Sequence, residues 1–91
     1  MIASMPTDTT YQGWKNYETW NVALYISNEY SLYRAAVDYV KFCIRNERPV
    51  SYREFIKTAG LVGHKTPDGV TWNGRKLCDA ELDADLRELV D

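Results

Sequence analysis

The stretch that decides the fold runs from residue 13 to residue 24 and reads Gly-Trp-Lys-Asn-Tyr-Glu-Thr-Trp-Asn-Val-Ala-Leu. An aromatic residue recurs at every third position around it, at Tyr11, Trp14, Tyr17 and Trp20. Large aromatic side chains dominate both small cores and protein interfaces. The segment is therefore either the centre of a small core or a surface that contacts a partner, and the residues alone leave both roles open.

The first helix is expected to begin at Asn16 or Thr19 and to run to about Asn28. Asn16 is a suitable N-cap because its short side chain can accept hydrogen bonds from the free N–H groups of the first turn. Helical spacing places Trp20 on an apolar face, so Trp20 is predicted to pack inward. Asn21 is a polar side chain on a mostly apolar helix, so it either bonds to groups inside the protein or faces a partner.

Apolar residues at helical spacing predict three more helices, each preceded by a capping side chain. These helices are expected over residues 32–46 after Ser31, residues 52–59 after Ser51, and residues 80–90 after Asp79. A chain of 91 residues allows one domain with a modest core. The predicted fold is mainly α: a flexible N-terminal arm at residues 1–12, then a single helical domain of about four short helices at residues 13–91.

The loop before the last helix, residues 61–76, is expected to be structured. Residues 66–69, Thr-Pro-Asp-Gly, match a type I turn, and Asn-Gly at 73–74 indicates a second turn. A hairpin between these turns would be minimal, and so short a hairpin is marginal on its own. Trp72 is predicted to insert into the helical core and hold the loop in place.

The composition is ordinary for a soluble globular protein, with 45% hydrophobic and 26% charged residues, and the net charge of −2 argues against a general nucleic-acid coater. The charge is unevenly placed. Residues 34–65 carry seven basic and three acidic side chains, whereas residues 77–91 carry six acidic side chains and one arginine. We favour pairing of the two segments within one chain over separate acidic and basic partners.

Cys43 and Cys78 lie far apart, each in an apolar helical context, and no stretch has the length of a membrane span or of a secretory signal. We therefore expect free thiols and a cytoplasmic protein.

No catalytic set is recognisable. His64 is the only histidine, and no nucleophile lies in a known motif, so we expect no enzyme activity. Cys43, His64, Cys78 and Asp79 lack the short paired spacing of zinc ligands. We expect neither a metal nor another cofactor.

An alternative function is nucleic-acid binding. Arg45, Arg48, Arg53 and Lys57 cluster around a proline, and Phe42 and Tyr52 lie nearby; arginines with interleaved aromatic residues can grip phosphates and stack on bases. The acidic last helix would oppose such binding unless it lies on the far side.

The preferred function is protein binding. Nine of the twelve aromatic residues lie between Tyr11 and Phe42, more than a core of this size can enclose. Aromatic residues beside arginine are typical of binding hot spots. The predicted partner contacts are Trp14, Asn21, Tyr25, Tyr30, Tyr33 and Arg34. A homo-oligomer that covers its own aromatic residues is a further alternative.

Three segments resemble a family of small uncharacterised proteins found in bacteriophages and in bacteria, cyanobacteria among them. The first is residues 14–26, Trp-Lys-Asn-Tyr-Glu-Thr-Trp-Asn-Val-Ala-Leu-Tyr-Ile, followed by Asn28-Glu29 and Leu32-Tyr33. The others are Thr-Pro-Asp-Gly-Val-Thr-Trp at 66–72 and Asp-Ala-Glu-Leu-Asp at 79–83. The resemblance covers most of the chain from about Gly13 onward.

This resemblance implies a context and no activity. It points to a small cytoplasmic, phage-encoded accessory protein of the kind that binds a larger host protein and inhibits or redirects it, which is an argument by analogy. It assigns no functional residues. Our hypothesis from the sequence is a non-enzymatic protein-binding modulator.

Overall fold

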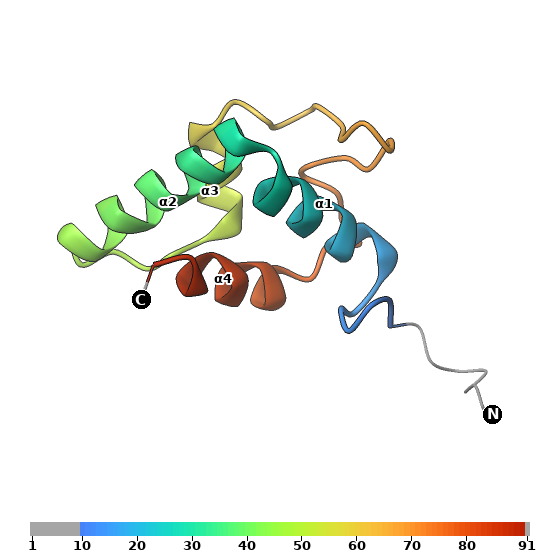
Figure 1. Ribbon diagram of the computed structural model, residues 1–91, viewed down its shortest axis with the longest axis horizontal. Coiled ribbons are helices and arrows are strands. Elements are labelled where there is room, and N and C mark those ends of the chain that lie inside the picture. Colours follow the sequence, from blue (N-terminus) through green and yellow to red (C-terminus); the bar gives the residue numbers. More distant parts are fainter. Residues whose placement is uncertain (1–9, 91) are drawn as a thin grey trace.

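The computed structural model describes residues 10–90, which contain four helices (Figure 1). They are α1 (Tyr17–Asn28), α2 (Tyr30–Arg45), α3 (Tyr52–Thr58) and α4 (Asp79–Glu88). Within this part of the chain there is no sheet, only isolated antiparallel bridges between Tyr11 and Trp14 and between Lys65 and Thr71. The predicted mainly α fold, a single small domain of four helices, is confirmed.

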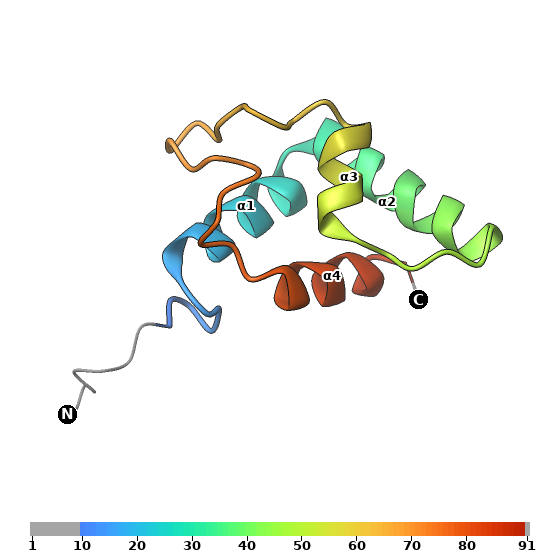
Figure 2. The ribbon, with the colours of Figure 1, turned by 180° about the vertical axis from the view of Figure 1, so that it is seen from behind.

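The helices surround one core. α1 and α2 follow each other at an angle, α3 crosses one face of α2, and α4 contacts all three of the others (Figures 1 and 2). The long loop between α3 and α4 runs past α1 before it returns to the start of α4 (Figure 2). The buried side chains of the core are Val22, Ala23, Ile26, Ala36, Val40, Tyr52, Phe55, Ile56, Val70, Trp72, Leu77, Leu82 and Leu86.

The loop is fixed to the core by Trp72, as the sequence predicts. This side chain is only 3% exposed, and its backbone oxygen accepts a hydrogen bond of 2.6 Å from the hydroxyl of Tyr52. Burial of that hydroxyl raises the pKa of Tyr52. The predicted turn at residues 66–69 is closed by a bond of 2.8 Å from the N–H of Gly69 to the oxygen of Thr66. Backbone and side-chain contacts together hold this loop against the helices.

Two of the predicted caps are confirmed. The Asn16 carboxamide oxygen accepts from the N–H of Thr19 at 2.9 Å, and the Ser51 hydroxyl accepts from the N–H of Glu54 at 3.3 Å. Both bonds join residues three apart, which is the spacing that makes N-caps readable from sequence. Gly60, just beyond α3, has the positive φ of +74° that helix-ending glycines adopt.

The other two predicted caps are wrong. α2 begins at Tyr30, two residues early, because the Glu29 carboxylate accepts from both the N–H and the hydroxyl of Ser31 and replaces Ser31 as the cap. α4 begins at Asp79 itself, after Cys78, and has no side-chain cap. The Asp79 carboxylate is instead bonded to Arg53.

Residues 1–9 of the predicted N-terminal arm lie outside the described residues. Tyr11 and Gln12 belong to a tight turn in which Tyr11 and Trp14 exchange two backbone hydrogen bonds of 2.7 Å. Among residues 10–90, no helix combines the length and the apolar character needed to cross a membrane.

Candidate protein-binding surface

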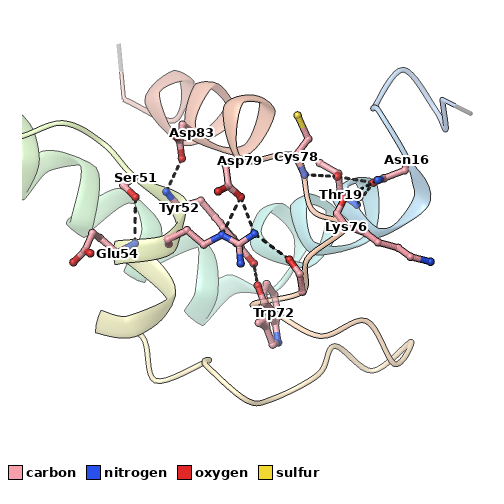
Figure 3. A network of polar contacts seen from close by, with 12 residues as sticks. Asn16, Thr19, Ser51, Tyr52, Glu54, Trp72, Lys76, Cys78, Asp79 and Asp83 are labelled. Atoms are coloured by element: carbon pink, nitrogen blue, oxygen red, sulfur yellow. Dashed lines mark hydrogen bonds and ion pairs between the residues drawn. The ribbon is translucent and has the colours of Figure 1, made fainter.

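Polar side chains at the start of α1 bond to distant segments of the chain: Asn16 and Thr19 to the segment just before α4, and Asn21, on a different side of the helix, to the loop. Thr19 is completely buried; its hydroxyl donates to the Asn16 side-chain oxygen at 2.6 Å and accepts from the N–H of Cys78 at 3.0 Å. The Asn16 amide group donates to the backbone oxygen of Lys76 at 2.7 Å (Figure 3). These bonds attach the start of α1 to the start of α4.

Asn21, a predicted partner contact, is also completely buried. Its amide nitrogen donates to the Asp68 carboxylate at 2.8 Å, and its oxygen accepts from the Thr66 hydroxyl at 2.7 Å. Thr66 in turn accepts from the N–H of Val70 at 3.2 Å. Asn21 therefore faces the loop and not solvent, and its hydrogen bonds fix the 66–69 turn against α1.

The basic cluster is partly engaged within the chain. Arg53 donates to the Asp79 carboxylate at 2.9 Å and to the backbone oxygen of Gly74 at 3.0 Å. Next to it, the N–H of Tyr52 donates to the Asp83 carboxylate at 2.7 Å (Figure 3). The basic middle and the acidic last helix thus meet directly at this point.

The other members of the basic cluster lie on the surface. Lys57 lies 3.3 Å from the Glu54 carboxylate, a pairing within α3. Arg45, at the end of α2, and Arg48, in the segment after it, are exposed. Among residues 10–90, the structure shows an ion pair for Arg53 and for Lys57 but none for Arg45 or Arg48.

Three aromatic side chains meet at the surface at the start of α1: Tyr17 and Trp20 on the helix and Tyr11 on the turn before it. We call them the aromatic cluster. The centre of the Tyr11 ring lies 5.2 Å from that of Tyr17 and 4.8 Å from that of Trp20, and the Tyr17 and Trp20 ring centres are 5.6 Å apart. Tyr11 and Tyr17 are 37% and 38% exposed. Partial burial, followed by the charge of Asp68, raises the pKa of Tyr17.

The prediction that Trp20 packs inward is wrong. Trp20 is half-buried by the other two rings of the aromatic cluster and is not among the side chains that form or cover the core. The inner face of α1 is occupied by Thr19, Val22 and Ile26, and Trp20 lies on the opposite side of the helix. The i, i+3 spacing of Tyr17 and Trp20 was the signal that could have placed them together.

The remaining predicted contacts fall into two groups. Trp14 and Tyr25 are half-buried and pack against the core, and the Tyr25 hydroxyl donates to Asp68 at 3.1 Å. Tyr30, Tyr33 and Arg34 lie on the exposed first turns of α2, with Tyr30 70% exposed. The Arg34 guanidinium donates to the Tyr30 hydroxyl at 3.1 Å. The second group can contact a partner without rearrangement of the fold.

Possible metal ligands do not gather among the residues that the structure describes. No three His, Cys, Asp or Glu side chains between residues 10 and 90 are placed to hold a metal ion. Cys43 is buried and Cys78 half-buried, and both are free thiols. His64 is exposed on the loop.

A family profile matches residues 7–91, nearly the whole chain. The chain belongs to DUF7249, a family of unknown function. Membership in DUF7249 agrees with the resemblance to an uncharacterised family noted from the sequence, and it transfers no activity. Searches of curated proteins and of solved structures found no match. The candidate surface therefore rests on the geometry of this chain.

Proposed function

We propose that this protein is a small non-enzymatic modulator that docks on a larger cellular protein and inhibits or redirects it. The observation that carries the proposal is the aromatic cluster: Tyr11, Tyr17 and Trp20 stack on one another outside the core. The exposed group Tyr30, Tyr33 and Arg34 on α2 is a second set of side chains that we assign to binding.

Stacked rings suit this role for two physical reasons. Tyr and Trp provide large contact areas with few rotatable bonds, so ordering them at an interface costs little entropy. Rings already held by their neighbours are pre-organised, which lowers the entropy cost of binding further. Edge-to-face and tilted ring pairs are each worth about 0.5–1.5 kcal/mol, enough to keep the cluster assembled before a partner arrives.

The cellular setting is part of the same proposal. The resemblance to proteins of bacteriophages and bacteria supports a phage-encoded accessory protein that acts in the cytoplasm on a host protein. The absence of a recognisable nucleophile and base in the sequence supports a mode of action by binding alone.

A pull-down from bacterial lysate, with and without nuclease, tests the proposal. We expect the tagged chain to retain a stoichiometric protein that survives nuclease and is lost with Trp20→Ala or Tyr33→Ala. Val62→Ala is the matched control, because Val62 is an apolar side chain 47% exposed on the distant loop. Thermal unfolding of each variant separates loss of binding from loss of fold.

Two results would overturn the proposal. Nucleic-acid binding through Arg45 and Arg48 would be favoured if the retained material disappears with nuclease. In that case its binding would also weaken steeply with salt and would not change with either aromatic substitution. A homo-oligomer on a sizing column that dissociates with Trp20→Ala would show that the aromatic cluster binds a second copy.

A further inference from the structure

α2 carries a row of apolar side chains that lies outside the core formed by the described residues. Tyr30, Tyr33 and Ile44 are 70%, 36% and 58% exposed, and Val37 is half-buried but not packed against the core. We call these four residues the α2 stripe. The buried row of the same helix, Ala36, Val40 and Cys43, runs beside the stripe, so the apolar surface of α2 is wider than the part that the core covers.

The spacing of the α2 stripe matches helix pairing. Its members follow one another by three, four and seven residues, which is the heptad spacing that keeps apolar side chains on one seam of a coiled coil. At 1.5 Å per residue, the 16 residues of α2 extend over about 24 Å, four turns of a helix. A partner helix of similar length would cover the whole stripe.

One edge of the α2 stripe is basic. Arg34, Lys41 and Arg45 follow one another by seven and four residues, which places them along a single row beside the stripe, and all three are exposed. Asp38, the only acidic residue in α2, lies in the same row between Arg34 and Lys41, so the edge carries three basic side chains and one carboxylate. Charges in this flanking position select the partner of a helix pair. The edge therefore favours a partner with carboxylates along the facing row.

A second copy of this chain fits that description poorly. In an antiparallel symmetric pair, both subunits use the same patch, so pairing α2 with α2 would bring two basic edges together. The acidic helix α4 has the right charge, but its side chains Leu82 and Leu86 are buried in the core. The basic edge therefore favours a helix of another protein as the occupant.

We propose that the α2 stripe binds an acidic amphipathic helix of the partner protein. The apolar side chains of that helix pack on Tyr33, Val37 and Ile44, and its carboxylates lie opposite Lys41 and Arg45. This inference rests on the proposed function, since it specifies the partner's chemistry, but it uses a different helix from the aromatic cluster.

Fluorescence anisotropy with two designed peptides tests the inference. Both are helical and carry leucine at heptad spacing; one has glutamate along both flanks and the other has lysine at the same positions. We expect the glutamate peptide to bind at least about tenfold more tightly than the lysine peptide, a difference of about 1.4 kcal/mol. Ile44→Ala and Lys41→Glu should each weaken binding of the glutamate peptide about tenfold.

Phe42→Ala is the matched control. Phe42 lies on α2 and is 44% exposed, but it lines a groove of about 620 Å³ between α2 and α3 rather than the α2 stripe. Binding of the glutamate peptide should not change in this variant. Absence of binding, equal affinity for both peptides, or sensitivity to Phe42→Ala without sensitivity to Ile44→Ala would each overturn the inference.

The failures of the two proposals are distinguishable. If the pull-down retains a partner that is lost with Trp20→Ala but kept with both Ile44→Ala and Lys41→Glu, the proposed function stands and the α2 inference fails. If the glutamate peptide binds through the α2 stripe while no protein depends on Trp20, the aromatic cluster is not the docking surface. Circular dichroism of the variants, all at exposed or half-buried positions, verifies that the fold is kept.

Discussion

The buried polar residues of α1 and the aromatic residues at its surface reverse the usual distribution of polar and apolar groups. Thr19 and Asn21 lie on different sides of the helix, and both are completely buried. Thr19 is bonded to the start of α4, and Asn21 is bonded to the loop. Tyr17 and Trp20 stack with Tyr11 at the surface. Buried polar groups with every bond made specify one arrangement of the chain. Surface aromatic residues do not serve the core, so we assign the buried polar residues to folding and the aromatic cluster to binding.

The largest expected effect comes from the tryptophan that belongs to the core. Trp72→Ala should lower the free energy of unfolding by about 3–5 kcal/mol, because it removes a large buried side chain by which the loop packs into the core. Urea denaturation followed by circular dichroism measures this loss. A loss below about 1 kcal/mol would mean that the loop is not held by Trp72.

Asn21→Ala sharpens the comparison at the buried polar positions of α1. Removal of the amide leaves the buried Thr66 hydroxyl without its acceptor and takes away one of the two hydrogen bonds that the Asp68 carboxylate accepts, so we expect a loss of about 2–3 kcal/mol in the free energy of unfolding. Asn28→Ala, at the exposed end of the same helix, is the control and should change stability by less than about 0.5 kcal/mol. Equal effects at the two positions would contradict a structural role for Asn21.

A pair of tyrosines provides a smaller, cleaner version of the same contrast. Tyr52→Phe removes only the hydroxyl that bonds to the oxygen of Trp72 and should cost about 1–2 kcal/mol in urea denaturation. Tyr30→Phe removes a hydroxyl from a side chain that is 70% exposed and should leave stability nearly unchanged. If the two substitutions cost the same, the buried hydrogen bond contributes nothing.

The smallest expected effect is electrostatic and concerns the cap of α2. The hydrogen bonds from Ser31 lower the pKa of the Glu29 carboxyl. A carboxyl whose pKa is lowered in the folded state stabilises the fold at any pH above its ordinary pKa of about 4.3. This contribution is lost as the pH falls through the pKa of the folded state. The thermal midpoints of the wild type and Glu29→Gln should therefore differ at pH 7 and converge in acid. A difference that does not change with pH would exclude the charged cap.

The parts of the fold that sequence predicts well depend on neighbouring residues. The caps at Asn16 and Ser51 involve bonds to residues three positions on. The helical spacing of apolar residues is equally local, since it relates residues three or four positions apart. Trp72 could be placed because a lone large aromatic residue in a polar loop has few other ways to avoid water. Two predicted caps fail: Glu29 replaces Ser31 as the cap of α2, and the Asp79 carboxylate bonds to Arg53 of the distant helix α3.

The candidate surface was harder to predict because it depends on distant segments. Asn21 is buried by Thr66 and Asp68, which are 45 and 47 residues away, and no local pattern shows that the loop will cover it. Trp20 was assigned inward because an amphipathic helix does not show which other elements will pack on it. The same is true of α2, whose two apolar rows become core and surface only when α1 and α4 are in place.

The most direct test of the central claim is the unfolding free energy of Trp20→Ala, measured by urea denaturation beside Trp72→Ala. If the aromatic cluster serves binding and not folding, Trp20→Ala will lower the free energy of unfolding by no more than about 2 kcal/mol, the order of its two ring contacts. A loss of about 3 kcal/mol or more, comparable with that of Trp72→Ala, would make Trp20 part of the folding core and contradict the account.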